Sequence, residues 1–169
     1  ISPVIAGLVF ILTFGRGSLL ENFLSNNNIK IVFAVPGIIL ATVFVTFPFI
    51  VRELIPLMNS QGKDEEEAAA IMGASGFTIF RKVTLPNIKW ALLYGIILCS
   101  ARAMGEFGAV SVVSGHIRGK TNTLPLHIEI LYNEYQFSAA FAVASILVII
   151  AVIILILRNI VEWKGKKEA

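Results

Sequence analysis

Two charged residues, Arg102 and Glu106, stand inside a long apolar stretch of the sequence. They are four residues apart, so on a helix they share one face and can pair. A charge at membrane depth is costly, and a residue that carries one there is a candidate for a functional site. An arginine facing the interior of a helix bundle could assist the passage of an anion. An ion pair that only fixes helix packing explains the same two residues, so both interpretations stay open.

The motifs of several enzyme classes are missing from the sequence. It has no G-x-x-x-x-G-K-[ST] run, the loop that holds ATP phosphates, and no G-x-S-x-G elbow of a hydrolase. His116 and His127 are not part of an H-E-x-x-H pattern, and Cys99 is the single cysteine. We therefore expect no metal site, no cofactor and no catalysis in this chain.

The composition is that of an integral membrane protein. Apolar residues make up 56% of the 169 residues and charged residues 15%, whereas soluble domains have about 45–50% and about 25%. The net charge of +3 is modest, and the basic residues do not alternate with aromatic ones on a polar face. Nucleic acid is therefore not an expected partner.

Apolar and polar segments alternate along the chain. A helix that spans a membrane needs about 20 apolar residues, and the opening run of 14 is too short and has no basic leader before it. We expect a fragment that lacks its N-terminal helices and begins inside one. The fold class predicted is all-α, with apolar helices at about 1–14 (truncated), 29–55, 88–113 and 139–161, and polar segments at 15–28, 56–87 and 114–138.

The positions of lysine and arginine predict the orientation. If the helices alternate in direction, residues 56–87 with their flanks and the C-terminal tail lie on one side of the membrane, and they carry nine basic residues against four on the other side. Basic residues gather on the cytoplasmic side. We therefore place residues 56–87 in the cytoplasm and residues 114–138 outside. The nine are Arg52, Lys63, Arg81, Lys82, Lys89, Arg158, Lys164, Lys166 and Lys167; the four are Arg16, Lys30, Arg118 and Lys120.

Two prolines, Pro36 and Pro48, fall in the second apolar segment. Proline removes a backbone hydrogen bond and kinks or breaks a helix. Broken membrane helices are common where transporters build a pathway. A static kink that only shapes packing is the alternative.

Residues 56–87 predict two short helices joined by a corner of small residues. The acidic run 65–67 suits the start of the first helix, and the pair Arg81-Lys82 suits the end of the second. Gly73 and Gly76 favour a bend, and Ser75 can cap the second helix. Leu85-Pro86 is expected to end the element. The apolar stripe of this segment could enter a groove of a partner protein, or the segment could be an ordinary hairpin at the membrane surface.

The same segment resembles the EAA signature of the permeases of ABC importers. The match consists of Glu67-Ala68-Ala69, three residues, Gly73, nine residues, Val83, one residue and Leu85-Pro86, with valine where the family usually has isoleucine. The resemblance covers the whole chain as the last four helices of a six-helix core. It implies the type I importer fold and a coupling helix that enters a cleft of a cytoplasmic ATPase subunit. The coupling residues it implies are Glu67, Ala68, Ala69, Gly73, Leu85 and Pro86.

A second stretch narrows the resemblance. The run "ARAMGEFGAVSVVSGHIRGKTNTLPLHIEILYNEY" and residues 33–58 are similar to the sulfate/thiosulfate importer permeases, in particular the W-type (CysW) subunits. The resemblance implies a multi-pass protein of the bacterial cytoplasmic (inner) membrane. Its implied partners are two copies of an ABC ATPase, a second homologous permease, an extracytoplasmic sulfate-binding protein that does most of the selecting, and the lipid bilayer.

Three alternatives accompany this expectation. Molybdate permeases share the Arg-Ala-x-Gly-Glu-Phe-Gly-Ala core around Arg102, so a molybdate or tungstate importer is the nearest one. A secondary transporter or channel that works without ATP is the alternative from another class. The sequence does not separate sulfate from thiosulfate, and a plastid membrane is as compatible with it as a bacterial one.

The polar segment 114–138 predicts a short helix at the outer interface. Leu124, Ile128, Leu131 and Tyr135 share one face, and Pro125 is tolerated in a first turn. The charges Arg118 and Lys120 could steer an anion or pair with a binding protein. They could equally be solvated loop charges.

Overall fold

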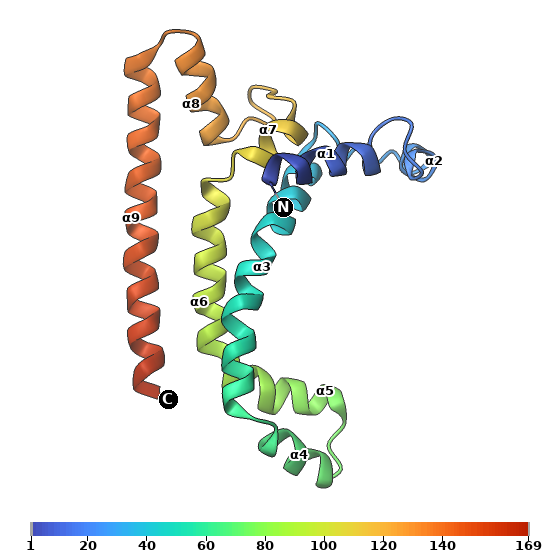
Figure 1. Ribbon diagram of the computed structural model, residues 1–169, viewed down its shortest axis with the longest axis vertical. Helices are drawn as coiled ribbons and strands as arrows, with labels where there is room; N and C mark the ends of the chain where they lie inside the picture. Colours follow the sequence, from blue (N-terminus) through green and yellow to red (C-terminus); the bar gives the residue numbers. More distant parts are fainter. Residues whose placement is uncertain (1, 169) are drawn as a thin grey trace. The chain divides into compact units, whose positions relative to one another are not determined.

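The computed structural model describes the backbone of residues 2–168 and the side chains of residues 2–163. Every regular element in that part is helical (Figure 1), which confirms the all-α prediction. Three described helical stretches are long and apolar enough to cross a membrane: Val35–Gln61, Gly76–Met104 and Phe137–Trp163. The side chains of Lys164, Lys166 and Lys167, used above for orientation, lie outside the described residues. The elements are α1 Pro3–Phe14, α2 Glu21–Asn26, α3 Val35–Gln61, α4 Asp64–Ile71, α5 Gly76–Ile79, the π-helix η1 Phe80–Thr84, α6 Leu85–Met104, α7 Gly108–Ser114, α8 Leu124–Asn133 and α9 Phe137–Glu168.

The second apolar segment forms a helix that begins later and ends later than the hydropathy pattern suggests. Helix α3 begins at Val35, two residues after Phe33, whose φ is +56°. Pro36 therefore lies in the first turn, where its missing N–H is not needed, and it does not break the helix. Pro48 and Pro56 lie inside α3, which continues through both.

The third apolar segment is divided, contrary to the single run expected over residues 88–113. Helix α6 ends at Met104 and the seven-residue α7 begins at Gly108. At its N-terminal end, α6 continues the preceding helix, because α5, η1 and α6 follow one another without a gap. The prediction that Leu85-Pro86 ends the preceding element was therefore wrong. Pro86 lies two residues after the end of the wider π turn, in which the hydrogen bonds already depart from the α pattern.

The chain divides into two compact units. One consists of Ile1–Phe47 and Ala101–Val152, and the other of Pro48–Ser100 and Ile153–Ala169. In the first unit, Ala41, Ala109 and Val113 are fully buried and Phe10 packs against them. Helices α1 and α7 approach closely here, since a Cβ atom added to Gly7 would lie 2.8 Å from the carbonyl oxygen of Ala109.

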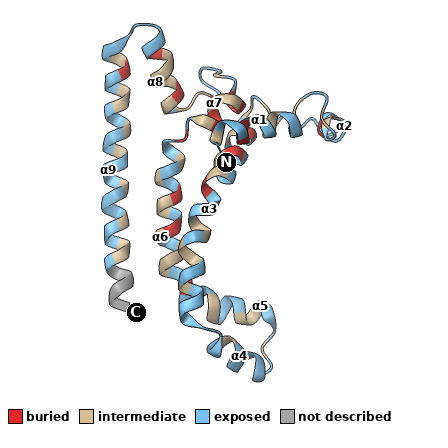
Figure 2. Ribbon diagram, viewed as in Figure 1, coloured by how far each residue is buried: buried red, intermediate tan, exposed pale blue. Residues whose placement is uncertain are grey.

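In the second unit, α6 packs against the C-terminal half of α3. A Cβ atom added to Gly95 would lie 3.5 Å from the Cα atom of Ile50, so the small residue permits close contact. Arg158 of α9 donates hydrogen bonds from its guanidinium to the hydroxyl of Tyr94, with an Nε–O distance of 3.0 Å. Most large apolar side chains of α9 are exposed (Figure 2). Apolar surface of this extent is suited to lipid or to other helices.

Candidate functional site

Residues 64–84, here called the polar hairpin, join α3 to α6 (Figure 1). Its first arm is α4, which begins with four acidic residues, Asp64–Glu67, at the positive end of the helix dipole. Its second arm is α5 followed by η1. The two short helices predicted from the sequence are therefore present. The basic pair Arg81-Lys82 lies in the last turn of the second arm, but the helix does not end there and continues into α6.

The corner of the polar hairpin is built by Gly73 and Ser75. Gly73 has a φ of +83° and follows the C-cap of α4. The N–H of Gly73 bonds to the carbonyl of Ala70 and that of Ala74 to the carbonyl of Ala69, the pattern of a Schellman motif. Ser75 is the N-cap of α5 and its hydroxyl accepts a hydrogen bond from the N–H of Thr78. The bend and the cap predicted from the sequence are both confirmed.

Large apolar side chains project from the corner of the polar hairpin into solvent. Ile71 is 86% exposed, Met72 81% and Phe77 73%. Phe80 is also exposed, and we call these four residues the apolar tip. Contiguous apolar side chains at a protein surface are typical of interaction sites. Of the residues implied by the resemblance, Glu67 and Ala68 are exposed, whereas Ala69 is buried between the arms.

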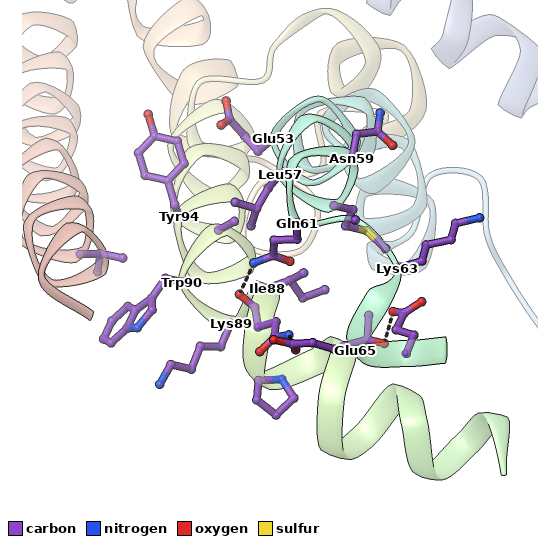
Figure 3. Close-up of a pocket in the computed structure, with 18 of the residues that line it drawn as sticks. Glu53, Leu57, Asn59, Gln61, Lys63, Glu65, Ile88, Lys89, Trp90 and Tyr94 are labelled. Carbon is purple, nitrogen blue, oxygen red and sulfur yellow. Dashed lines mark hydrogen bonds between the residues drawn. The ribbon is translucent and has the colours of Figure 1, made fainter. Parts of the chain in front are cut away.

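Three hydrogen bonds close the base of the polar hairpin. The hydroxyl of Thr84 donates to Oε1 of Glu66 at 2.6 Å, and Nδ2 of Asn87 donates to Oε2 of Glu65 at 2.5 Å. The side chain of Gln61, the last residue of α3, donates to the backbone carbonyl of Asn87 at 3.2 Å. These residues border an open cavity of about 1070 Å³ whose lining Figure 3 shows. The sequence analysis did not single out this set, which has no periodicity to reveal it.

The membrane-depth pair Arg102 and Glu106 is close together, as the spacing predicts. Nη2 of Arg102 lies 3.6 Å from Oε2 of Glu106, and the side chains are 44% and 1% exposed. Oε2 of Glu106 has no hydrogen-bond partner among the described atoms. The two charges therefore form an ion pair without a hydrogen bond, so the carboxylate of Glu106 does not take up the N–H donors of the guanidinium.

Glu106 also has a partner that the sequence analysis did not foresee. Its Oε1 atom accepts a hydrogen bond from the backbone N–H of Ala109 at 3.0 Å. Ala109 is in the first turn of α7, where N–H groups lack acceptors within the helix. Glu106 thus caps α7 as well as facing Arg102. Its two carboxylate oxygens have different neighbours.

The segment before and within α8 is held by contacts inside the chain. Arg118 forms an ion pair with Glu134, and Nε2 of His116 lies 3.6 Å from Oε2 of Glu129. Arg118 is therefore paired rather than a freely solvated charge. The predicted helix is present with Pro125 in its first turn, but Tyr135 lies beyond its end and is 82% exposed. The face that packs carries Leu126 and Leu131.

The described residues contain no group of three or more histidine, cysteine, aspartate or glutamate side chains placed to hold a metal ion.

Comparison with known proteins identifies the family of this chain. The sequence model described as "Binding-protein-dependent transport system inner membrane component" matches residues 2–166. The chain belongs to this family. With its apolar helices, it is a multi-pass membrane protein.

Individual relatives refine the comparison. "Sulfate transport system permease protein CysW" of Escherichia coli (strain K12) is 54% identical over 168 residues, which is 99% of this chain and 58% of the relative. "Sulfate permease 2, chloroplastic" of Chlamydomonas reinhardtii is 52% identical over 169 residues, 100% of this chain and 46% of the relative. "Sulfate transport system permease protein CysT" of Salmonella typhimurium is 35% identical over 158 residues, 94% of this chain and 57% of the relative. The chain thus spans less than two thirds of the length of each of these relatives.

Proposed function

We propose that the chain is part of a permease subunit of an ATP-driven sulfate importer. The observation that carries this proposal is the identity of 54% to a CysW protein, against 35% to a CysT protein, over nearly the whole chain. The difference favours the W-type subunit of the pair. A protein of the T type is then the second permease, and transport of thiosulfate accompanies that of sulfate.

The polar hairpin is the part that binds the ATPase in this proposal. The chain has no phosphate-binding loop of its own, so ATP hydrolysis belongs to a partner subunit, present in two copies. The apolar tip supplies an exposed surface for a groove of that partner. Glu67 and Ala68 lie on the exposed side of α4, whereas Ala69, Gly73, Leu85 and Pro86 shape the hairpin and its junction with α6. Such binding places residues 64–84 in the cytoplasm, and the whole protein in the bacterial inner membrane.

Arg102 is the residue we assign to the anion pathway. Its side chain is 44% exposed and its donors are not taken by the carboxylate of Glu106. A guanidinium can present two parallel N–H donors to an oxyanion such as sulfate. Glu106 balances the positive charge when no anion is present. Selection among anions rests mainly with an extracytoplasmic binding protein.

Uptake of labelled sulfate tests the proposal. The full-length protein and its partners are expressed in cells that lack sulfate transport, with an excess of thiosulfate or molybdate as competitor. We expect uptake that thiosulfate inhibits strongly and molybdate weakly, and that disappears when the ATPase subunit is omitted. Accumulation of molybdate without sulfate would indicate a molybdate importer. Uptake that continues without the ATPase subunit would indicate a secondary transporter or channel.

A further inference from the structure

The two arms of the polar hairpin are joined by a hydrogen bond far from the apolar tip. Glu66 is in the first turn of α4 and Thr84 is the last residue of η1, and their side chains meet at 2.6 Å. The contact is partly buried, which protects it from competition by water. Two further hydrogen bonds, from Gln61 and to Glu65, connect the same region to Asn87. The base of the polar hairpin is therefore closed on itself.

The adjacent glutamates of α4 face different ways. Glu66 and Ala69 are three residues apart and share a face. Glu66 is half-buried at Thr84, and Ala69 is 8% exposed. Glu67 is exposed, and no side-chain hydrogen bond joins it to another residue in the part of the chain that the structure describes. Glu67 can thus contact a partner protein while Glu66 contacts the second arm.

The second arm continues directly into the membrane helix. Residues Gly76–Met104 form one continuous helical stretch, interrupted in its hydrogen-bond pattern only by the π turn Phe80–Thr84. The first arm has no such continuity with α6, because Gly73 and Ser75 turn the chain between the arms. A force on the first arm reaches α6 through the corner or through the two contacts at the base, Glu66 with Thr84 and Glu65 with Asn87. The π turn is the point of the second arm where the helix is wider and less regular.

We propose that Glu66 is a positioning residue for energy coupling, which locks the first arm to the end of the π turn so that the polar hairpin and α6 move as one body. This inference rests on the proposed function, in which an ATPase binds the apolar tip. Without the Glu66–Thr84 contact, the base of α4 is joined to α6 by the exposed Glu65–Asn87 hydrogen bond, and α6 follows the movement of α4 less closely. ATP is then hydrolysed with little sulfate transported.

Four variants of the complete transporter test this role. Thr84→Val keeps the size of the side chain but removes the hydroxyl donor, and Thr84→Ser restores a hydroxyl. Glu66→Ala removes the acceptor, and Glu66→Gln keeps an amide oxygen in its place. Ser60→Ala is the matched control, since the hydroxyl of Ser60 bonds only to the carbonyl of Leu57 within its own exposed helix turn.

Sulfate uptake and ATP hydrolysis are measured in the same proteoliposomes, which contain both permeases, the ATPase and the binding protein. For Thr84→Val and Glu66→Ala we expect sulfate transported per ATP to fall about tenfold, as the loss of one hydrogen bond to a charged group would give. Thr84→Ser, Glu66→Gln and Ser60→Ala keep a ratio near that of the unmodified protein. The double variant Glu66→Ala/Thr84→Val should lower the sulfate transported per ATP no further than either single variant, because both substitutions break the same contact.

An unchanged ratio in Thr84→Val and Glu66→Ala would overturn the inference. The inference would also be overturned if these variants gave less assembled transporter but a normal amount of sulfate per ATP in the transporter that does assemble. That result would mean that the contact is purely structural. Failure of the proposed function looks different: the unmodified protein would neither retain the ATPase nor need ATP for uptake.

Discussion

Because the two oxygens of the Glu106 carboxylate have different partners, substitutions of Glu106 should lower the stability of the protein by different amounts. Oε1 accepts a hydrogen bond from the N–H of Ala109, a residue that is fully buried, and Oε2 faces only the half-exposed Arg102. Glu106→Gln keeps an oxygen for the N–H. It loses an ion pair whose partner is 44% exposed, so we expect a change within about 1 kcal/mol. Glu106→Ala leaves the buried N–H of Ala109 without an acceptor, which costs about 1–3 kcal/mol, and adds the loss of packing.

Removal of the arginine has an intermediate effect. In Arg102→Gln the carboxylate of Glu106, 1% exposed, loses its counter-charge. Loss of one partner of a fully buried pair costs about 3–5 kcal/mol, and the exposure of Arg102 reduces this to about 1–2 kcal/mol. The double variant Arg102→Gln/Glu106→Gln has no unpaired charge and should be more stable than Arg102→Gln alone.

The assay is the temperature at which half of the purified transporter loses its monodisperse form in detergent. A change of 1 kcal/mol shifts such a midpoint by about 2–4 °C for a domain of this size. Glu106→Ala should therefore lower it by about 4–10 °C and Glu106→Gln by less than about 4 °C. Sulfate uptake should fall more in Arg102→Gln than in Glu106→Gln. If Glu106→Gln were as unstable as Glu106→Ala, the hydrogen bond to α7 would not be what Glu106 contributes.

Three further predictions concern other parts of the chain. Gly73 has a φ of +83°, so Gly73→Val should open the corner at a cost of about 1–2 kcal/mol and reduce co-purification of the ATPase, while Gly73→Asn, which tolerates this backbone, should retain it. Phe77→Asp should lower retention of the ATPase about tenfold or more, whereas Leu19→Asp, at a residue that is even more exposed but lies outside the polar hairpin, should not. Gly7→Leu should destabilise the contact of α1 with α7 by about 1–3 kcal/mol, and Gly105→Ala, with no atom nearer than 4.0 Å, should not; the midpoint of thermal inactivation measures both.

Local signals in the sequence were sufficient to predict the structure at positions where a single residue determines the backbone conformation. The bend at Gly73 and the cap at Ser75 follow from the conformations that glycine and serine favour, and the structure has both. Hydropathy identified the membrane helices because they are long and apolar. Pro36 was read as a possible break, but its place in the first turn of α3 depends on where the helix begins. Hydropathy locates such a boundary only within several residues.

Contacts between distant residues were not predictable in the same way. The bond between Glu66 and Thr84 joins residues 18 apart, and no periodicity marks either one. The end of α6 was missed because apolar residues resume at Phe107, directly after Glu106, and the hydropathy run continues to Val113. Glu106 was interpreted only as the partner of Arg102, since its second bond goes to a backbone N–H that any residue could supply.

The continuous helix from Gly76 to Met104 limits how the length of this segment can change. Each residue inserted into an α-helix rotates everything beyond it by about 100° and advances it by about 1.5 Å. One extra residue between Phe77 and Gly95 would turn the glycine away from Ile50 and bring a larger side chain against α3. A π turn already contains one more residue than an α turn. The loop at residues 115–123, which has no regular helix, can absorb insertions, whereas the stretch from the apolar tip to Gly95 must keep its residue count.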